Sequence, residues 1–193
     1  MKNHTKLFCI AGAAALPLFL LAPGHASRRQ KAPFLGMNFA HRGLHSRDKS
    51  VPENSITAFR LAARAGYGVE LDVHLLKDGT LAVIHDSDLS RTTGQTGRVE
   101  DLTAEELRNY RLQGSEQTIP ELGQVLSLFD GQVPLIIELK SAGGNAAKLT
   151  ETACRMLESY RGTYCLESFD PACILWLRKT ARTSSGASWR KTP

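Results

Sequence analysis

The sequence lacks the cysteine spacing from which a disulfide framework or a zinc site is usually recognised. Its four cysteines include no CxxC pair. Acidic residues are absent from residues 1–37 and 178–193, and each of these ends carries five lysines or arginines. Because the whole chain has a net charge of +5, the residues between the ends carry a net charge of −5. The basic character therefore belongs to the ends, and no nucleic-acid-binding face is expected on the domain.

Internal repeats and low-complexity segments are also missing, which excludes fibrous and repeat architectures. The 193 residues have room for one domain or at most two, and 42% hydrophobic with 22% charged residues is typical of a globular protein. The sequence gives no indication of the oligomeric state.

The first 33 residues read as a signal peptide or an N-terminal membrane anchor with a basic flank. A short basic start is followed by an apolar run of 17 residues, 7–23, and then by the polar, basic segment GHASRRQK. The run lies between the length of a signal-peptide core and the roughly 20 residues of a membrane span. A buried helix of a soluble domain is a third interpretation. We expect an exported or membrane-anchored protein and favour the anchor.

Beyond this segment, expected strands alternate with expected helices. Such alternation indicates βαβ units and a parallel sheet, so the predicted fold class is α/β. The helix at 54–66 has Asn54 or Ser55 as its cap, and Pro171 begins the last helix. A long polar excursion, 87–118, contains a short helix from Thr103 to Arg111. The expected strands are 37–40, 68–76, 81–86, 133–140 and 163–169, and the other helices are 119–131, 145–160 and 170–179.

Polar residues gather at the carboxyl ends of these strands, where (β/α) barrels place their catalytic groups. Glu70 and Asp72 share one face of their strand because side chains alternate along a strand. With Glu138 they form an all-oxygen ligand set, which suits one divalent cation, Mg²⁺ or Ca²⁺. The alternative for these acids is simple ion pairing with Arg42 or Lys140.

Two histidines follow neighbouring strands and offer acid–base chemistry near neutral pH. We interpret His41 and His85 as this pair, although a single such histidine would more often make a structural hydrogen bond. Arg42 and Lys140 are expected to bind an anion, and phosphate is the natural ligand of a guanidinium beside a cation. His74, on the face of the acids, is interpreted as a rim residue without a role.

At these residues the chain resembles the glycerophosphodiester phosphodiesterase family. The resemblance covers about residues 39–179 and follows the family's order and spacing through AHRG, PENSITAFRLAARAGYGVELDV, KDGTLAVIHDSDLSRTTG, DLTAEEL, IPELGQVL, LIIELK and ESFDP. It implies a TIM-like (β/α)₈ barrel over 34–179 with an insertion at 87–118. It also implies a cation on Glu70, Asp72 and Glu138, His41 and His85 as acid and base, and phosphate contacts from Arg42 and Lys140.

The implied reaction is hydrolysis of a small-molecule glycerophosphodiester to an alcohol and sn-glycerol 3-phosphate, in many members through a cyclic phosphate. Glu53 matches a family position near the site, and its role stays open between the metal network and holding Arg42. The alcohol of the substrate is not predicted.

The chain supplies only about five of the eight strands that the resemblance implies. Residues 180–193 lack apolar periodicity and are interpreted as an aberrant tail, for which a shifted reading frame is our hypothesis. The leading expectation is therefore a truncated member of the family, with impaired activity. Two alternatives are a non-catalytic, membrane-tethered binding fragment and a related barrel phosphodiesterase acting on phosphoinositides or sphingolipids.

Overall fold

The computed structural model describes residues 27–183 of the chain, which divides into two compact units, Met1–Lys31 and Ala32–Pro193. In the first unit the described part holds only the short helix α2 (Arg28–Lys31). Most of the predicted signal or anchor segment lies outside the described residues, as does most of the predicted tail. Among the described helices, none combines the length and apolarity that a membrane crossing requires.

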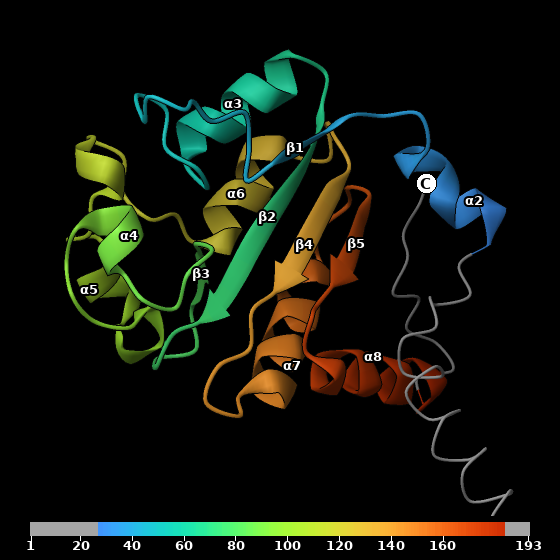
Figure 1. Ribbon diagram of the computed structural model, residues 1–193. Helices are drawn as coiled ribbons and strands as arrows, with labels where there is room; N and C mark the ends of the chain where they lie inside the picture. The colour runs from blue at the N-terminus through green and yellow to red at the C-terminus, as the bar shows by residue number, and fades with distance from the viewer. Residues whose placement is uncertain (1–26, 184–193) are drawn as a thin grey trace, which may run out of the picture. The chain divides into compact units, whose positions relative to one another are not determined.

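The second unit alternates strands and helices along the chain (Figure 1). Helix α8 extends four residues beyond the boundary expected at 179. The strands are β1 (Phe39–His41), β2 (Gly68–Leu75), β3 (Leu81–Val83), β4 (Leu135–Leu139) and β5 (Tyr164–Glu167). The helices are α3 (Ile56–Arg64), α4 (Ser90–Thr93), α5 (Ala104–Leu107), α6 (Leu122–Phe129), α7 (Ala146–Leu157) and α8 (Pro171–Thr183), with 3₁₀ turns η1 (Ala32–Phe34), η2 (Val99–Asp101) and η3 (Leu112–Gly114).

The strands form one sheet in the order β1-β2-β4-β5, parallel throughout, with β3 attached to β2. β3 departs from the parallel sheet that the alternation of strands and helices indicated, because it runs antiparallel to β2. The reason is the short connection at 76–80, because so few residues between two paired strands allow only a hairpin. Within residues 27–183, β1 and β5 are the edges of an open sheet, so the described part is a portion of the implied barrel.

Local signals in the sequence define the helix ends. The Ser55 hydroxyl accepts a hydrogen bond from the Ala58 N–H at 3.1 Å and caps α3, as predicted. Gly66, in the left-handed region with φ +73°, ends that helix. Pro171 begins α8, also as predicted. The helix expected from Thr103 to Arg111 is shorter, ending at Leu107, because its capping box fixes one turn and no apolar stripe extends it.

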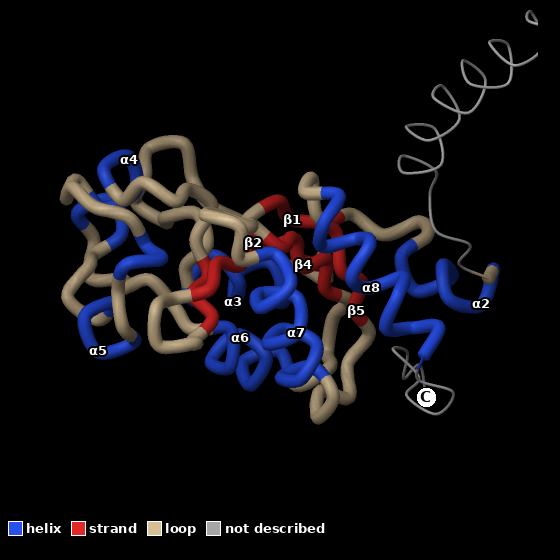
Figure 2. The backbone as a smooth tube through the Cα atoms, turned by 90° about the horizontal axis from the view of Figure 1, so that it is seen from below, coloured by secondary structure: helices blue, strands red, loops and turns tan. Residues whose placement is uncertain are grey.

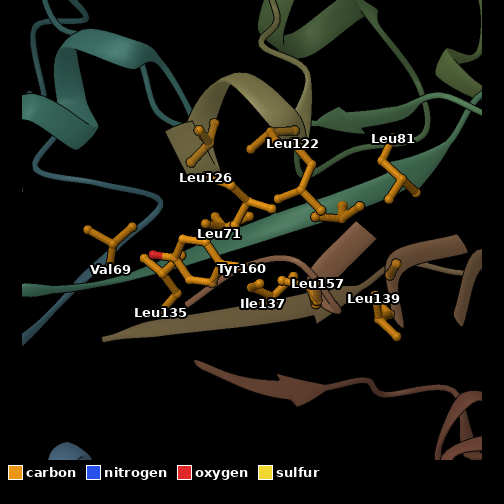
Figure 3. Packing of buried hydrophobic residues seen from close by; sticks show 14 of the residues in the cluster. Val69, Leu71, Leu81, Leu122, Leu126, Leu135, Ile137, Leu139, Leu157 and Tyr160 are labelled. Carbon is orange, nitrogen blue, oxygen red and sulfur yellow. The ribbon is translucent and has the colours of Figure 1, made fainter. Parts of the chain in front are cut away.

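Strand alternation divides the sheet into a helix-facing side and a second side. Figure 3 shows Val69, Leu71, Leu135 and Ile137 packed with residues of α6 and α7, and Figure 2 shows α3, α6 and α7 along this one face. The alternate residues of β2 and β4, among them Glu70, Asp72 and Glu138, point to the other side. Burial of the helix-facing side thus presents the acids together on the opposite side.

The insertion at 87–118 carries a small hydrophobic core of its own. Leu89, Val99, Leu107 and Leu112 are each at most 1% exposed and pack with Ile84 from the end of β3. This packing fixes the insertion beside the end of β3, where His85 and Asp86 follow.

Replacing Phe129 by alanine should lower the free energy of unfolding by about 3–5 kcal/mol, the usual cost of removing a large buried ring. Phe129 is fully buried, with its ring centroid 5.9 Å from that of Phe59. Denaturant unfolding of the full chain measures the change. Leu35→Ala is the control: its side chain is 69% exposed, so a shift within about 0.5 kcal/mol is expected. Equal effects of the two substitutions would contradict this assignment of the core.

Candidate active site

Three carboxylates converge on the side of the sheet opposite the helices. Glu70, Glu138 and Glu167 each place an oxygen within 4.8 Å of the others. Glu70 and Glu138 are buried, whereas Glu167 lies exposed at the end of β5. The Oε1 atom of Glu70 is buried without a hydrogen-bond partner. A set of carboxylate oxygens with an unsatisfied buried atom is suited to a hard divalent cation.

Mutual repulsion is visible in the electrostatics of this cluster. Burial, followed by the charges of Asp72 and Glu138, raises the pKa of Glu70 to about 7. Burial and the charges of Glu138 and Asp72 also raise the pKa of Glu167. Both shifts mean that the cluster resists full ionisation until positive charge is supplied.

Asp72 lies beside the cluster and contacts cationic side chains. Its carboxylate is 3.2 Å from Nζ of Lys140 and 3.5 Å from Nε of Arg42, and it accepts a hydrogen bond from Nδ2 of Asn54 at 2.9 Å. The structure thus brings the predicted ligands Glu70 and Glu138 together with Glu167, and Asp72 contacts both cations beside them. The ligand role of Asp72 stays a prediction.

Arg42 and Lys140 flank the acids, as expected for an anion-binding pair. Arg42 has a left-handed backbone, φ +57°, and its N–H donates to Oε2 of Glu70 at 2.9 Å. Nζ of Lys140 lies 2.8 Å from Oε1 of Glu138. Burial lowers the pKa of Lys140, but the contacts with Glu138 and Asp72 outweigh burial and raise this pKa overall. Both cations are therefore held beside the carboxylates in their charged forms.

The two histidines lie in different surroundings. His41 is exposed, with Nε2 3.8 Å from Oε2 of Glu70, and its partial burial and the charge of Arg42 lower its pKa. Nδ1 of His85 is 2.6 Å from Oδ1 of Asp86, which leaves Nε2 of His85 available for proton transfer. His85 comes near Asp72 through the hairpin of β2 and β3 and not through the end of a parallel strand. The Ile84 N–H, one residue before His85, donates to the Asp72 carbonyl at 3.1 Å.

Glu53 holds arginines. Its Oε1 accepts from Nη1 of Arg42 at 3.1 Å and from Nη2 of Arg91 at 2.6 Å. Arg91 also donates through Nε to Asp86, the partner of His85. Burial works against ionisation of Glu53, but the hydrogen bonds and charges of Arg91 and Arg42 lower its pKa overall. Of the two roles left open for Glu53, this geometry favours holding Arg42.

The sequence analysis assigned no role in the site to four participants in this arrangement: Glu167, Asn54, Asp86 and Arg91. Glu167 had a signal, an acid at the end of a strand next to the one that ends with Glu138. Asp86 follows His85 directly. Asn54 and Arg91 gave no comparable signal, because their partners are 18 and 38 residues away in the chain.

Without a divalent cation, the stability of the protein should fall as pH rises from about 4.5 to 7. The folded state retains the proton of Glu70 up to about pH 7, whereas the ordinary value for the unfolded chain is 4.5. Since the folded state binds more protons in this window, raising pH favours unfolding. Thermal unfolding in chelator across this range measures the trend. Glu70→Gln should lose this component, so wild-type and variant curves that stay parallel would contradict it.

The comparisons with known proteins agree with this geometry. The sequence model of the glycerophosphoryl diester phosphodiesterase family matches residues 41–184. The chain belongs to this family. The phosphodiesterase match includes every residue of the site named above, from His41 to Glu167.

Two curated phosphodiesterase relatives show the extent of the match. The glycerophosphodiester phosphodiesterase of Bacillus altitudinis is 42% identical over 109 residues, covering 53% of this chain and 43% of that protein. Glycerophosphodiester phosphodiesterase 1 of Homo sapiens is 36% identical over 156 residues, covering 74% of this chain and 45% of that protein. The chain thus spans less than half the length of these relatives.

Solved phosphodiesterase structures share the fold. A glycerophosphodiester phosphodiesterase from Parabacteroides distasonis aligns with a TM-score of 0.66 and 27% identity, over 77% of this chain and 62% of that one. A phosphodiesterase from Oleispira antarctica, in complex with the product sn-glycerol-3-phosphate, aligns with a TM-score of 0.68 and 26% identity, over 76% and 62%. The fold class predicted from the sequence, a barrel of this family, is confirmed, with an open five-stranded portion in the described residues.

Proposed function

We propose that this chain carries the centre of a divalent-cation-dependent phosphodiesterase that hydrolyses glycerophosphodiesters to an alcohol and sn-glycerol 3-phosphate. The observation that carries the proposal is the convergence of an acidic cluster, two cations and two histidines on one side of the sheet. Support comes from the family match and from the product that the Oleispira antarctica structure holds. The apolar run at 7–23 further leads us to propose an exported or membrane-anchored location.

Glu70 and Glu138, two of the three ligands predicted from the sequence, would hold the cation together with Glu167, and Asp72 stays a predicted ligand. The fit rests on the buried, unpartnered Oε1 of Glu70 and on the absence of sulfur or imidazole from the set, which favours Mg²⁺ or Ca²⁺. When bound, such an ion would offset the negative charge that builds up on a phosphate in the transition state.

Arg42 and Lys140 bind and orient the phosphate oxygens. Asp72 contacts both side chains, and Glu53 fixes the guanidinium of Arg42 from the other side. A guanidinium held in a defined orientation is suited to two-point recognition of phosphate. The acids around the cations therefore position them for the substrate.

His41 acts as the base and His85 as the acid in the first step. The lowered pKa of His41 keeps its ring neutral, so Nε2 can accept the proton of the glycerol 2-hydroxyl as that oxygen bonds to phosphorus. Asp86 stabilises the charged ring of His85, whose Nε2 gives its proton to the leaving alcohol as the P–O bond breaks. Water then opens the cyclic phosphate, with the two proton transfers reversed.

Following the phosphorus signals of glycerophosphocholine by NMR tests the proposal on the full chain. With Mg²⁺ or Ca²⁺ present, we expect sn-glycerol 3-phosphate and free choline. Release of phosphocholine instead would show cleavage of the other ester bond and contradict the assignment. Thermal stabilisation by the cation without turnover would favour the non-catalytic binding module, and turnover of phosphoinositides or sphingolipids without glycerol 3-phosphate would favour the related barrel enzyme.

A further inference from the structure

Next to the candidate site lies a buried histidine that the reaction above does not use. His74 follows Asp72 on the same face of β2, and its side chain is only 3% exposed. His74 is therefore not at the rim, as the sequence interpretation placed it: the residue is buried, in contact with His85 and with Glu100 of the insertion. Both nitrogens of its ring contact oxygen atoms, as buried polar groups usually do, so the identity of the two partners matters more than their number.

One of these acceptors is the backbone carbonyl of His85, the residue proposed as the general acid. Nε2 of His74 is 3.1 Å from the carbonyl oxygen of His85. A carbonyl can only accept, so Nε2 carries a hydrogen and donates it. The bond crosses from β2 to the second residue after β3, a strand of only three residues, Leu81–Val83.

The other acceptor is an acid from the insertion. Nδ1 of His74 lies 2.7 Å from Oε1 of Glu100 in η2. Burial works against ionisation, but hydrogen bonds from His74 and Ser87 lower the pKa of Glu100 to about 2. Glu100 is thus a carboxylate at neutral pH, and its Oε2 accepts from the Ser87 hydroxyl at 2.6 Å and lies 3.4 Å from Nη2 of Arg98.

Together these contacts fix the segment 84–87 on both sides of the proposed acid. Ahead of His85, the Ile84 N–H donates to the Asp72 carbonyl at 3.1 Å. After it, Ser87 is held through its hydroxyl by Glu100 and through its carbonyl by the Val99 N–H at 2.9 Å. Among residues 27–183, the backbone carbonyl of His85 accepts one hydrogen bond, and its donor is Nε2 of His74.

We propose that His74 and Glu100 form a positioning pair that sets the place of the His85 backbone for proton transfer. The proposal rests on the function proposed for His85 in the previous subsection. His74 touches no reacting group; it acts through the main chain of His85, while Asp86 orients the ring. Displacement of a catalytic group by about 1 Å can cost about a hundredfold in rate, so the pair is expected to matter for kcat rather than for substrate binding.

Two substitutions separate the two hydrogen bonds of His74. In His74→Gln the side-chain amide takes the place of Nε2 and still donates to the His85 carbonyl, whereas in His74→Asn it takes the place of Nδ1 and reaches only Glu100. We expect His74→Asn to lower kcat about tenfold to a hundredfold with KM within about threefold, and His74→Gln to retain most of kcat. A merely structural histidine would lose activity in both, in proportion to the loss of thermal stability.

A second pair of variants covers the case in which a change at His74 prevents folding. Glu100→Leu removes the acceptor for Nδ1 at similar volume, and Glu100→Gln keeps an acceptor oxygen. The leucine variant also loses the acceptor of the Ser87 hydroxyl, so it releases the segment after His85 as well and should lower kcat. The glutamine variant should stay within about threefold of the wild type.

Backbone ¹⁵N relaxation at His85 in the full chain tests positioning without any need for turnover. We expect a rigid amide in wild type, His74→Gln and Glu100→Gln, and a mobile one in His74→Asn and Glu100→Leu. An unchanged His85 amide in all variants would overturn the proposal. A mobile amide in the two disrupted variants of a protein that never releases glycerol 3-phosphate would support the pair while refuting the proposed function.

Discussion

Replacing His85 by asparagine should lower kcat for glycerophosphodiester hydrolysis by about a hundredfold to ten-thousandfold, the range that a general acid or base contributes. Asparagine keeps a donor near the position of Nδ1, so the 2.6 Å contact with Asp86 can be retained. It lacks Nε2, the nitrogen proposed to protonate the leaving alcohol. Release of sn-glycerol 3-phosphate, followed at saturating substrate, measures the change.

His45→Asn is the matched control for this experiment. His45 is exposed, and Nδ1 of its ring contacts the Gly43 carbonyl at 3.2 Å, outside the acidic cluster. Its replacement should leave kcat within about threefold. If His85→Asn and His45→Asn have the same small effect, His85 is not the proton donor.

Replacing Glu138 by glutamine should abolish the response of the protein to divalent cations. Wild-type protein at a cation concentration of 100 times Kd gains about 2.7 kcal/mol of stability, because the ion binds the folded state alone. Glutamine removes one of three charges whose oxygens lie within 4.8 Å of one another, so the increase in Tm with Mg²⁺ or Ca²⁺ should largely disappear. Thermal unfolding with and without the cation measures this increase in Tm. In the same variant, kcat should fall by at least about a hundredfold.

The control for this change removes a carboxylate from the surface. Glu151 lies exposed on α7 and pairs with Arg155 at 2.8 Å. Glu151→Gln should retain the full increase in Tm. A Glu138→Gln variant that still gains the wild-type increase would show that the ion binds elsewhere.

The sequence predicted much of this site because strand alternation is a local property. Glu70 and Asp72 share a face whatever the strand packs against, and the helix-facing leucines and valines decide which face that is. The parallel pairing of β2 with β4 then sets Asp72 beside Glu138, at register positions that the alternation of strands and helices made predictable.

What the sequence did not predict depends on contacts between distant segments. The direction of β3 follows from the short turn before it, whereas the overall alternation of strands and helices indicated only a parallel sheet. Arg91 lies 38 residues from Glu53, and Glu100 lies 26 residues from His74. Both belong to the insertion, whose packing depends on its own small core, and pattern reading had no means of placing that core against the sheet.

The central claim is that the acidic cluster, the two cations and the two histidines form one cation-dependent phosphodiesterase centre. The most direct test is to strip the full chain with chelator, titrate Mg²⁺ or Ca²⁺ back, and follow sn-glycerol 3-phosphate release from glycerophosphocholine. We predict that release stops in chelator and returns along a saturating curve with one ion per chain. Release that continues unchanged in excess chelator would contradict the claim.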